Sequence, residues 1–114
     1  MKIFKFGGAS VKDAQGVKNV ATVLQQTGHT NLVIVVSAMG KMTNALEGVV
    51  NSYFQEPAKV KQAIEDIKAY HWSVSKEIFT DLNDPVFSQI QTLITTLCES
   101  HHLLHLQNFR SLFA

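Results

Sequence analysis

The chain has 114 residues, of which 46% are hydrophobic, and ten lysines and arginines against nine acidic residues leave a net charge of +1. This length limits the chain to one domain of ordinary size, and its hydrophobic content predicts a buried core. Because a nearly neutral chain has no overall field to attract DNA, RNA or an anionic membrane, we expect no nucleic acid and no membrane partner, and any anion site to be local.

Residues 2–6 predict a short strand, and residues 13–26 predict a helix because their apolar side chains recur at helical spacing. Asp13 is expected to cap this helix and Gly28 to end it in a left-handed conformation. Residues 32–36 read LVIVV. This run is too short for a typical helix and rich in β-branched residues, which predicts a strand buried on both faces. Strand, helix and strand in this order predict a right-handed parallel crossover.

The next helix is expected over residues 44–53, where Thr43 or Asn44 can cap and Glu47 can complete a capping box. The loop before it then occupies the same position as the loop after the first strand. Both loops are expected at the carboxyl ends of parallel strands, which is where open α/β sheets bind their ligands.

The second half of the chain changes character. A long helix is predicted over residues 56–79, with Pro57 at its first turn, and Asp84 and Pro85 signal the start of another. No third strand and no linker is evident. We expect an α/β fold, a partial three-layer α/β/α sandwich with a parallel sheet core and a helix-rich second half, forming one domain over residues 1–114 without an internal boundary.

The single cysteine, Cys98, excludes an intrachain disulfide. A strand that begins almost at Met1 leaves no room for a signal segment, and no apolar run reaches membrane-spanning length, so we expect a cytoplasmic protein. Cys98, His102 and His105 share one helix face and could bind zinc, but their spacing matches no standard zinc pattern and we expect no metal site. Tyr70, His71 and Trp72 could stack on bases, although residues at this spacing more often lie in a core or a helix interface.

The segment 5–11, KFGGASV, carries the strongest chemical signal. Glycines let backbone amides approach a ligand closely, and Lys5 beside them supplies a mobile positive charge for phosphate oxygens. A plain strand-to-helix turn is the alternative interpretation. The segment is neither a Walker P-loop nor a three-glycine dinucleotide fingerprint, so those two classes of nucleotide site are disfavoured.

A second segment, 37–44, reads SAMGKMTN and places two hydroxyls, an amide and a lysine between a strand and a helix start. Helix amino ends favour anions, and hydroxyls can orient a carboxylate or a phosphate. The alternative is that Thr43 or Asn44 only caps its helix. Two such segments at equivalent strand ends favour a ligand site.

These two segments resemble, in order and separation, the first two motifs of the aspartate kinases in the amino-acid kinase superfamily. Ala9 stands where many members have threonine. Other amino-acid kinases share the glycine-rich first loop, but its pairing with VVSAMGKMTN at residues 35–44 resembles the aspartate-specific branch. The resemblance covers the chain as an amino-terminal portion, because the family's later Gly-Glu motif, nucleotide-binding half and ACT domains are not found before Ala114.

The resemblance implies transfer of the ATP γ-phosphoryl group to the β-carboxylate of L-aspartate, the first step toward lysine, threonine and methionine, with ATP and Mg²⁺ in a complete, homo-oligomeric enzyme. It implies that Lys5 is the catalytic residue. It also implies that the phosphates are bound by Lys5, Gly7, Gly8, Ala9 and Ser10, and that aspartate is bound by Ser37 and Thr43. We expect the 114-residue chain alone to lack kinase activity. The alternatives are a non-catalytic fold or self-association module derived from such an enzyme, or another amino-acid kinase.

Overall fold

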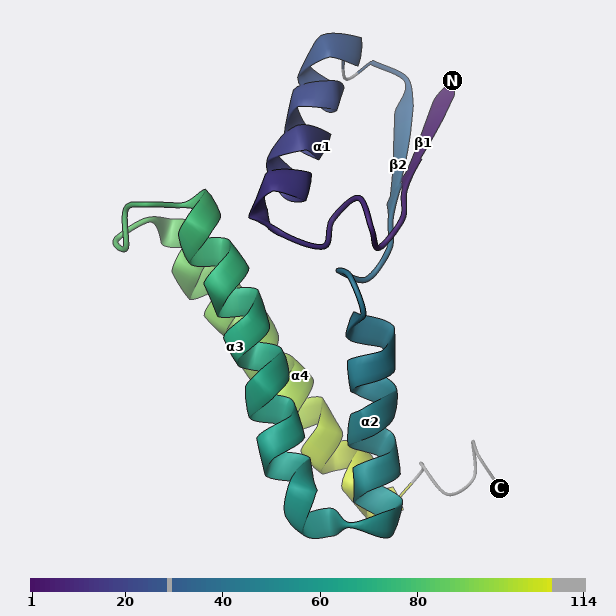
Figure 1. The fold of residues 1–114 in the computed structure, drawn as a ribbon, viewed down its shortest axis with the longest axis vertical. Coiled ribbons are helices and arrows are strands. Elements are labelled where there is room, and N and C mark those ends of the chain that lie inside the picture. Colours follow the sequence, from purple (N-terminus) through teal and green to yellow (C-terminus); the bar gives the residue numbers. More distant parts are fainter. Residues whose placement is uncertain (29, 108–114) are drawn as a thin grey trace. The chain divides into compact units, whose positions relative to one another are not determined.

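A computed structural model describes the backbone of residues 1–28 and 30–107 and the side chains of residues 1–28 and 30–96. The chain divides into two compact units, Met1–Thr80 and Asp81–Ala114, each considered by itself below. The described residues form two strands, four α-helices and one 3₁₀ helix (Figure 1). This confirms a partial α/β fold with a parallel sheet and a helix-rich second half.

The first unit contains a parallel pair of strands, β1 (Lys2–Phe6) and β2 (Leu32–Val36). Lys5 lies opposite Val35 in the register, and Phe6 lies opposite Val36. The helix α1 (Ala14–Thr27) connects the two strands. Both strands have the predicted bounds, and the parallel crossover is confirmed.

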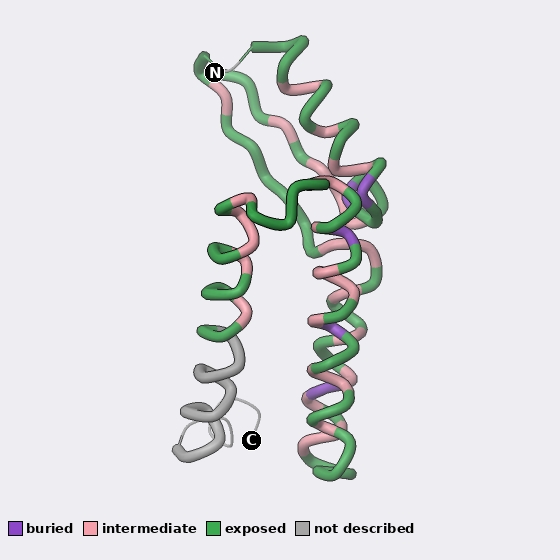
Figure 2. The backbone as a smooth tube through the Cα atoms, turned by 90° about the vertical axis from the view of Figure 1, so that its left-hand side faces the viewer, coloured by how far each residue is buried: buried purple, intermediate pink, exposed green. Residues whose placement is uncertain are grey.

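The prediction that β2 is buried on both faces is wrong. Val33 is 41% exposed and Val36 is 56% exposed, and no residue of the strand is buried (Figure 2). The reason is the size of the sheet, since the described residues supply two strands and too few elements to cover both faces. On β1, Phe4 and Phe6 are half-buried and meet edge to face with ring centroids 6.4 Å apart.

The helix α1 begins and ends one residue later than predicted, with Asp13 before it and Gly28 after it. A carboxylate oxygen of Asp13, Oδ1, accepts a hydrogen bond of 2.8 Å from the amide of Gly16, which confirms the cap. Gly28 has the expected positive φ of 79°, but its ψ of 167° is extended rather than left-handed helical. The backbone therefore leaves helical geometry at Gly28, without the left-handed helical conformation predicted there.

The helix α2 (Met42–Gln55) begins two residues before the predicted start. Lys41 is its N-cap and makes no side-chain capping bond, so the capping box of Thr43 or Asn44 with Glu47 is wrong. The cause lies in the preceding loop, where the Met42 amide bonds to the Met39 carbonyl and a turn leads directly into the helix. Thr43 and Asn44 consequently lie within the first helical turn.

The chain then passes through a 3₁₀ helix, η1 (Pro57–Lys59), into α3 (Val60–Ile78), so the predicted long helix exists with a tighter first turn. Pro57 begins it as expected, because proline at this position loses no intrahelical hydrogen bond. The α3 helix packs against α2 and also contacts α1. The core of the described part is small and consists of five buried residues: Val11, Ala14, Val49, Ile67 and Val74.

The second unit contains α4 (Pro85–Gln107), whose start matches the sequence signal. Asp84 accepts a 2.9 Å hydrogen bond from the Val86 amide. The candidate metal ligands Cys98, His102 and His105 fall outside the described side chains, so the absence of a metal site stays a prediction. Among the described residues, no helix has the length and apolarity required to cross a membrane.

Candidate functional site

Two loops meet where the parallel strands end. Loop 1 (residues 7–13) follows β1, and loop 2 (residues 37–41) follows β2. The Ser37 amide donates a 2.9 Å hydrogen bond to the Phe6 carbonyl, and the Gly40 amide donates one of 2.9 Å to the Gly8 carbonyl. The two chemistry-bearing segments are therefore bonded side by side, as the parallel crossover predicted.

Loop 1 keeps several of its backbone donors available. The Ser10 amide turns back to the Gly7 carbonyl at 3.0 Å, but the amides of Gly7, Gly8 and Ala9 have no hydrogen-bond partner among the described residues. A Cβ atom on Gly7 would meet nothing within 4 Å, so this side of the loop is open. Successive backbone amides next to open space suit an anion such as a phosphate group.

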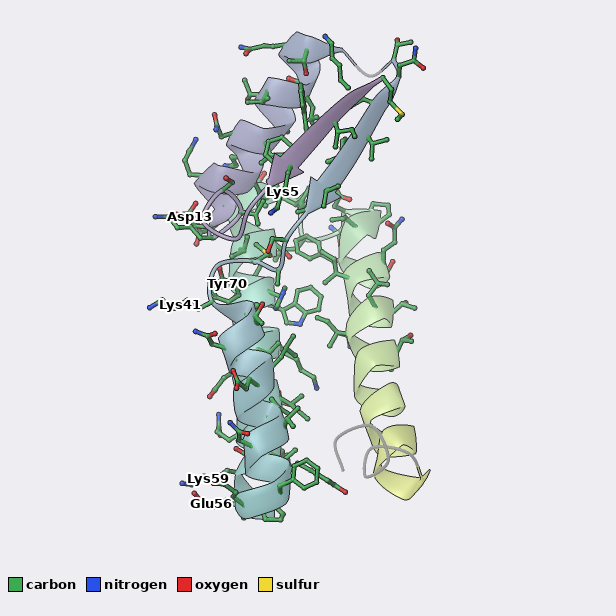
Figure 3. All side chains as sticks on the ribbon, turned by 90° about the vertical axis from the view of Figure 1, so that its right-hand side faces the viewer. Lys5, Asp13, Lys41, Glu56, Lys59 and Tyr70 are labelled. Atoms are coloured by element: carbon green, nitrogen blue, oxygen red, sulfur yellow. The ribbon has the colours of Figure 1, made fainter. Side chains whose placement is uncertain are left out.

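Lys5 is the last-but-one residue of β1 and is exposed (Figure 3). Because side chains alternate along a strand, Lys5 lies on the face opposite to Phe4 and Phe6. Within the part of the chain that the structure describes, no carboxylate forms an ion pair with it. Its ammonium group is thus available to an external anion.

The charges around the loops are predominantly positive. Residues 5–13 and 37–44 contain three lysines, Lys5, Lys12 and Lys41, against one carboxylate, Asp13. Asp13 already accepts the Gly16 amide hydrogen at the start of α1. This balance favours a phosphate or carboxylate ligand over a metal cation.

The two hydroxyl residues of the second segment lie on loop 2 and on the helix that follows it. Ser37 and Thr43 are both exposed, and their hydroxyls make no hydrogen bond among residues with described side chains. The amides of Thr43 and Asn44, in the first turn of α2, likewise have no backbone partner in the described chain. A helix amino end with such donors can receive a carboxylate.

Sequence reasoning missed one residue that contacts both loops. The hydroxyl of Tyr70, on α3, donates a hydrogen bond to the Lys12 carbonyl in loop 1. Tyr70 lies 58 positions away from Lys12, and no local pattern signals such a distant contact. Tyr70 is half-buried, and its hydroxyl contacts loop residues.

A Gly8→Ala substitution is expected to separate the two loops. A Cβ atom at this position would lie 2.9 Å from the Gly40 carbonyl oxygen and 3.0 Å from that of Ala38, both in the backbone of loop 2. Overpacking of this kind should lower the free energy of unfolding by about 1–2 kcal/mol, measured by urea denaturation.

Gly7→Ala is the matched control, because the added methyl group enters open space. It should change the free energy of unfolding by less than about 0.5 kcal/mol. Equal losses in the two variants would contradict the close approach of the loops at Gly8.

The chain is similar in sequence to known amino acid kinases. A sequence profile described as the amino acid kinase family matches residues 1–104. The chain is 35% identical over 83 residues to aspartokinase 1, chloroplastic, of Arabidopsis thaliana, a match covering 69% of this chain and 14% of that protein. It is 48% identical over 44 residues to aspartokinase 2, chloroplastic, of the same plant, covering 39% of this chain and 8% of the relative.

A bacterial relative, aspartokinase 2 of Bacillus subtilis (strain 168), is 40% identical over 58 residues, which cover 48% of this chain and 14% of that protein. The chain thus spans only a small share of the length of the curated relatives it matches.

Proposed function

The chain belongs to the amino acid kinase family, and from this premise we propose that it is the amino-terminal part of an aspartate kinase. Such an enzyme transfers the γ-phosphoryl group of ATP to the β-carboxylate of L-aspartate, the first step toward lysine, threonine and methionine. The observation that carries the proposal is the bonded pair of loops at one sheet end, joined from the Gly40 amide to the Gly8 carbonyl. All three relatives described above are named aspartokinases, which supports the choice of acceptor.

Loop 1 is proposed to hold the phosphates of ATP. Catalysis of phosphoryl transfer depends mainly on aligning the reactants and neutralising the charge on the transferring oxygens. In this scheme Lys5 is the catalytic residue that neutralises this charge, while Gly7, Gly8 and Ala9 offer backbone amides. Ser10 supports the loop through the hydrogen bond that its amide donates to the Gly7 carbonyl.

The two segments fit the phosphates of ATP but not Mg²⁺. Their one carboxylate, Asp13, is engaged in capping α1, so no residue here is assigned as a magnesium ligand. Magnesium bound with the nucleotide would add positive charge to the phosphates. None of the roles proposed for residues of this chain depends on the metal ion.

Loop 2 and the start of α2 are proposed to seat aspartate. The exposed hydroxyls of Ser37 and Thr43 offer donors to a carboxylate, as do the amides of Thr43 and Asn44, which have no partner among the described residues. The distance between the two loops then sets the distance between the phosphate donor and its acceptor. Effective catalysis requires these reactants to be held close and in line.

A second candidate is a non-catalytic, self-associating module derived from such an enzyme. The exposed apolar residues of both strands favour it, since uncovered sheet faces and edges promote association. Homo-oligomerisation, the cytoplasmic location and the assignment of residues 1–114 to a single domain stay predictions. A different amino-acid kinase would share loop 1 and differ in its acceptor.

A hybrid enzyme tests the proposal. The first unit of this chain, Met1–Thr80, replaces the matched segment of Arabidopsis aspartokinase 1, and ADP release is followed with L-aspartate or L-glutamate as acceptor. We expect release that depends on aspartate and is at least about tenfold slower with glutamate, because a site built for one carboxylate spacing discriminates against the longer acid.

The 114-residue chain alone is the second sample and is expected to show no aspartate-dependent ADP release. A folded hybrid that prefers glutamate would contradict the proposed acceptor. Turnover by the chain alone would contradict the proposal that the phosphoryl-transfer site needs residues from a longer protein.

A further inference from the structure

Tyr70 joins the two loops from a third element of the fold. Its hydroxyl donates to the Lys12 carbonyl, so α3 is bonded directly to loop 1. Lys12 lies immediately before Asp13, the residue that caps α1. One hydroxyl therefore fixes the end of loop 1 at the point where it enters its helix.

The same hydroxyl lies against loop 2. Gly40 has a φ of +53°, and a Cβ atom built on it would lie 3.2 Å from the Tyr70 oxygen. The backbone of Gly40 can occupy this position because it carries no side chain. Gly40 is also the residue whose amide bonds to Gly8 in loop 1. Tyr70 thus contacts loop 1 at Lys12 and loop 2 at Gly40, and Gly40 is one of the two residues hydrogen-bonded at the junction between the loops.

The ring of Tyr70 is itself held in place. It meets the ring of His71 edge to face with centroids 5.6 Å apart. The Nδ1 atom of His71 is 2.8 Å from the carbonyl oxygen of Ile67, one turn earlier on α3, and Ile67 is buried in the core. A hydroxyl on a ring supported in this way can hold a neighbouring loop in one position.

We propose that Tyr70 is a positioning residue that keeps loop 1 and loop 2 at a fixed separation for phosphoryl transfer. It contacts the loops and not the reacting groups. This inference rests on the proposed function in treating the two loops as the seats of phosphate and acceptor. Loss of the hydroxyl should loosen the loops while leaving the helix packing intact.

Amide hydrogen exchange of the full 114-residue chain, followed by NMR, tests the inference in a Tyr70→Phe variant. The Gly40 amide should exchange about three- to tenfold faster than in the unaltered chain, the change that corresponds to one lost hydrogen bond. The Ile67 amide, inside α3, should keep its exchange rate within about twofold, since the ring remains. The ratio of the two rates separates local loosening from a general loss of stability.

Tyr53→Phe is the control, because it removes a hydroxyl from the far end of α2 and should leave Gly40 exchange unchanged. Unaltered exchange at Gly40 in Tyr70→Phe would overturn the inference, as would equal acceleration at Gly40 and Ile67. The exchange is measured without substrate, so it decides the role of Tyr70 even if the hybrid enzyme shows that the acceptor is not aspartate.

Discussion

Lys5→Ala, introduced into the hybrid enzyme, is expected to lower kcat by about 100- to 1000-fold, the range seen when one charge-stabilising donor is removed from an active site. The reason is that Lys5 carries the only cationic side chain on β1 next to loop 1, where the amides of Gly7, Gly8 and Ala9 provide no net charge. Its effect should appear in kcat more than in the KM for aspartate, since the charge on the transferring oxygens is greatest in the transition state.

Lys2→Ala provides the matched control on the same strand. Lys2 is also exposed, but it lies at the opposite end of β1 from the loops. Its replacement should change kcat by less than about twofold, as expected for a surface charge away from the site. Equal loss of kcat in the two variants would show that any substitution on β1 lowers kcat, whether or not it removes the charge next to loop 1. An unaltered kcat in Lys5→Ala would contradict the proposed catalytic role of Lys5.

The position of the site could be predicted because its determinants are local. Five β-branched or aliphatic residues at 32–36 and a short run at 2–6 define strands of the observed bounds. The intervening helix supplies the crossover connection that two adjacent parallel strands need. Parallel strands bring their carboxyl ends to one edge, so the meeting of loop 1 with loop 2 followed without any knowledge of distant contacts.

The sequence-based predictions failed where the structure depends on the residues and elements that surround a segment. An apolar run indicates that β2 can be buried on both faces, but burial depends on how many elements surround it, and here Val33 to Val36 are exposed. The start of α2 depends on the turn from Met39 to Met42, which overrides the capping preference of Thr43. The Tyr70 contact with Lys12 bridges 58 positions and leaves no periodic signal.

Gly16→Ala is expected to destabilise the chain although alanine is the better helix former. Gly16 lies in the first turn of α1, and a Cβ atom there would lie 2.5 Å from the Ser10 carbonyl oxygen in loop 1. Because that atom belongs to the backbone, loop 1 must move away from the helix. We expect the free energy of unfolding to fall by about 2–3 kcal/mol, the upper part of the range for overpacking.

Gly48→Ala should have the opposite sign. Gly48 lies inside α2, and a Cβ atom there would meet nothing within 4 Å, so the gain in helix propensity of about 0.5–1 kcal/mol is not offset by a clash. Urea denaturation of both variants measures the difference. If Gly16→Ala stabilised the chain as Gly48→Ala does, loop 1 could not be packed on α1 through Ser10. The amide donors of loop 1 at Gly7, Gly8 and Ala9 would then lack the support of the helix behind them.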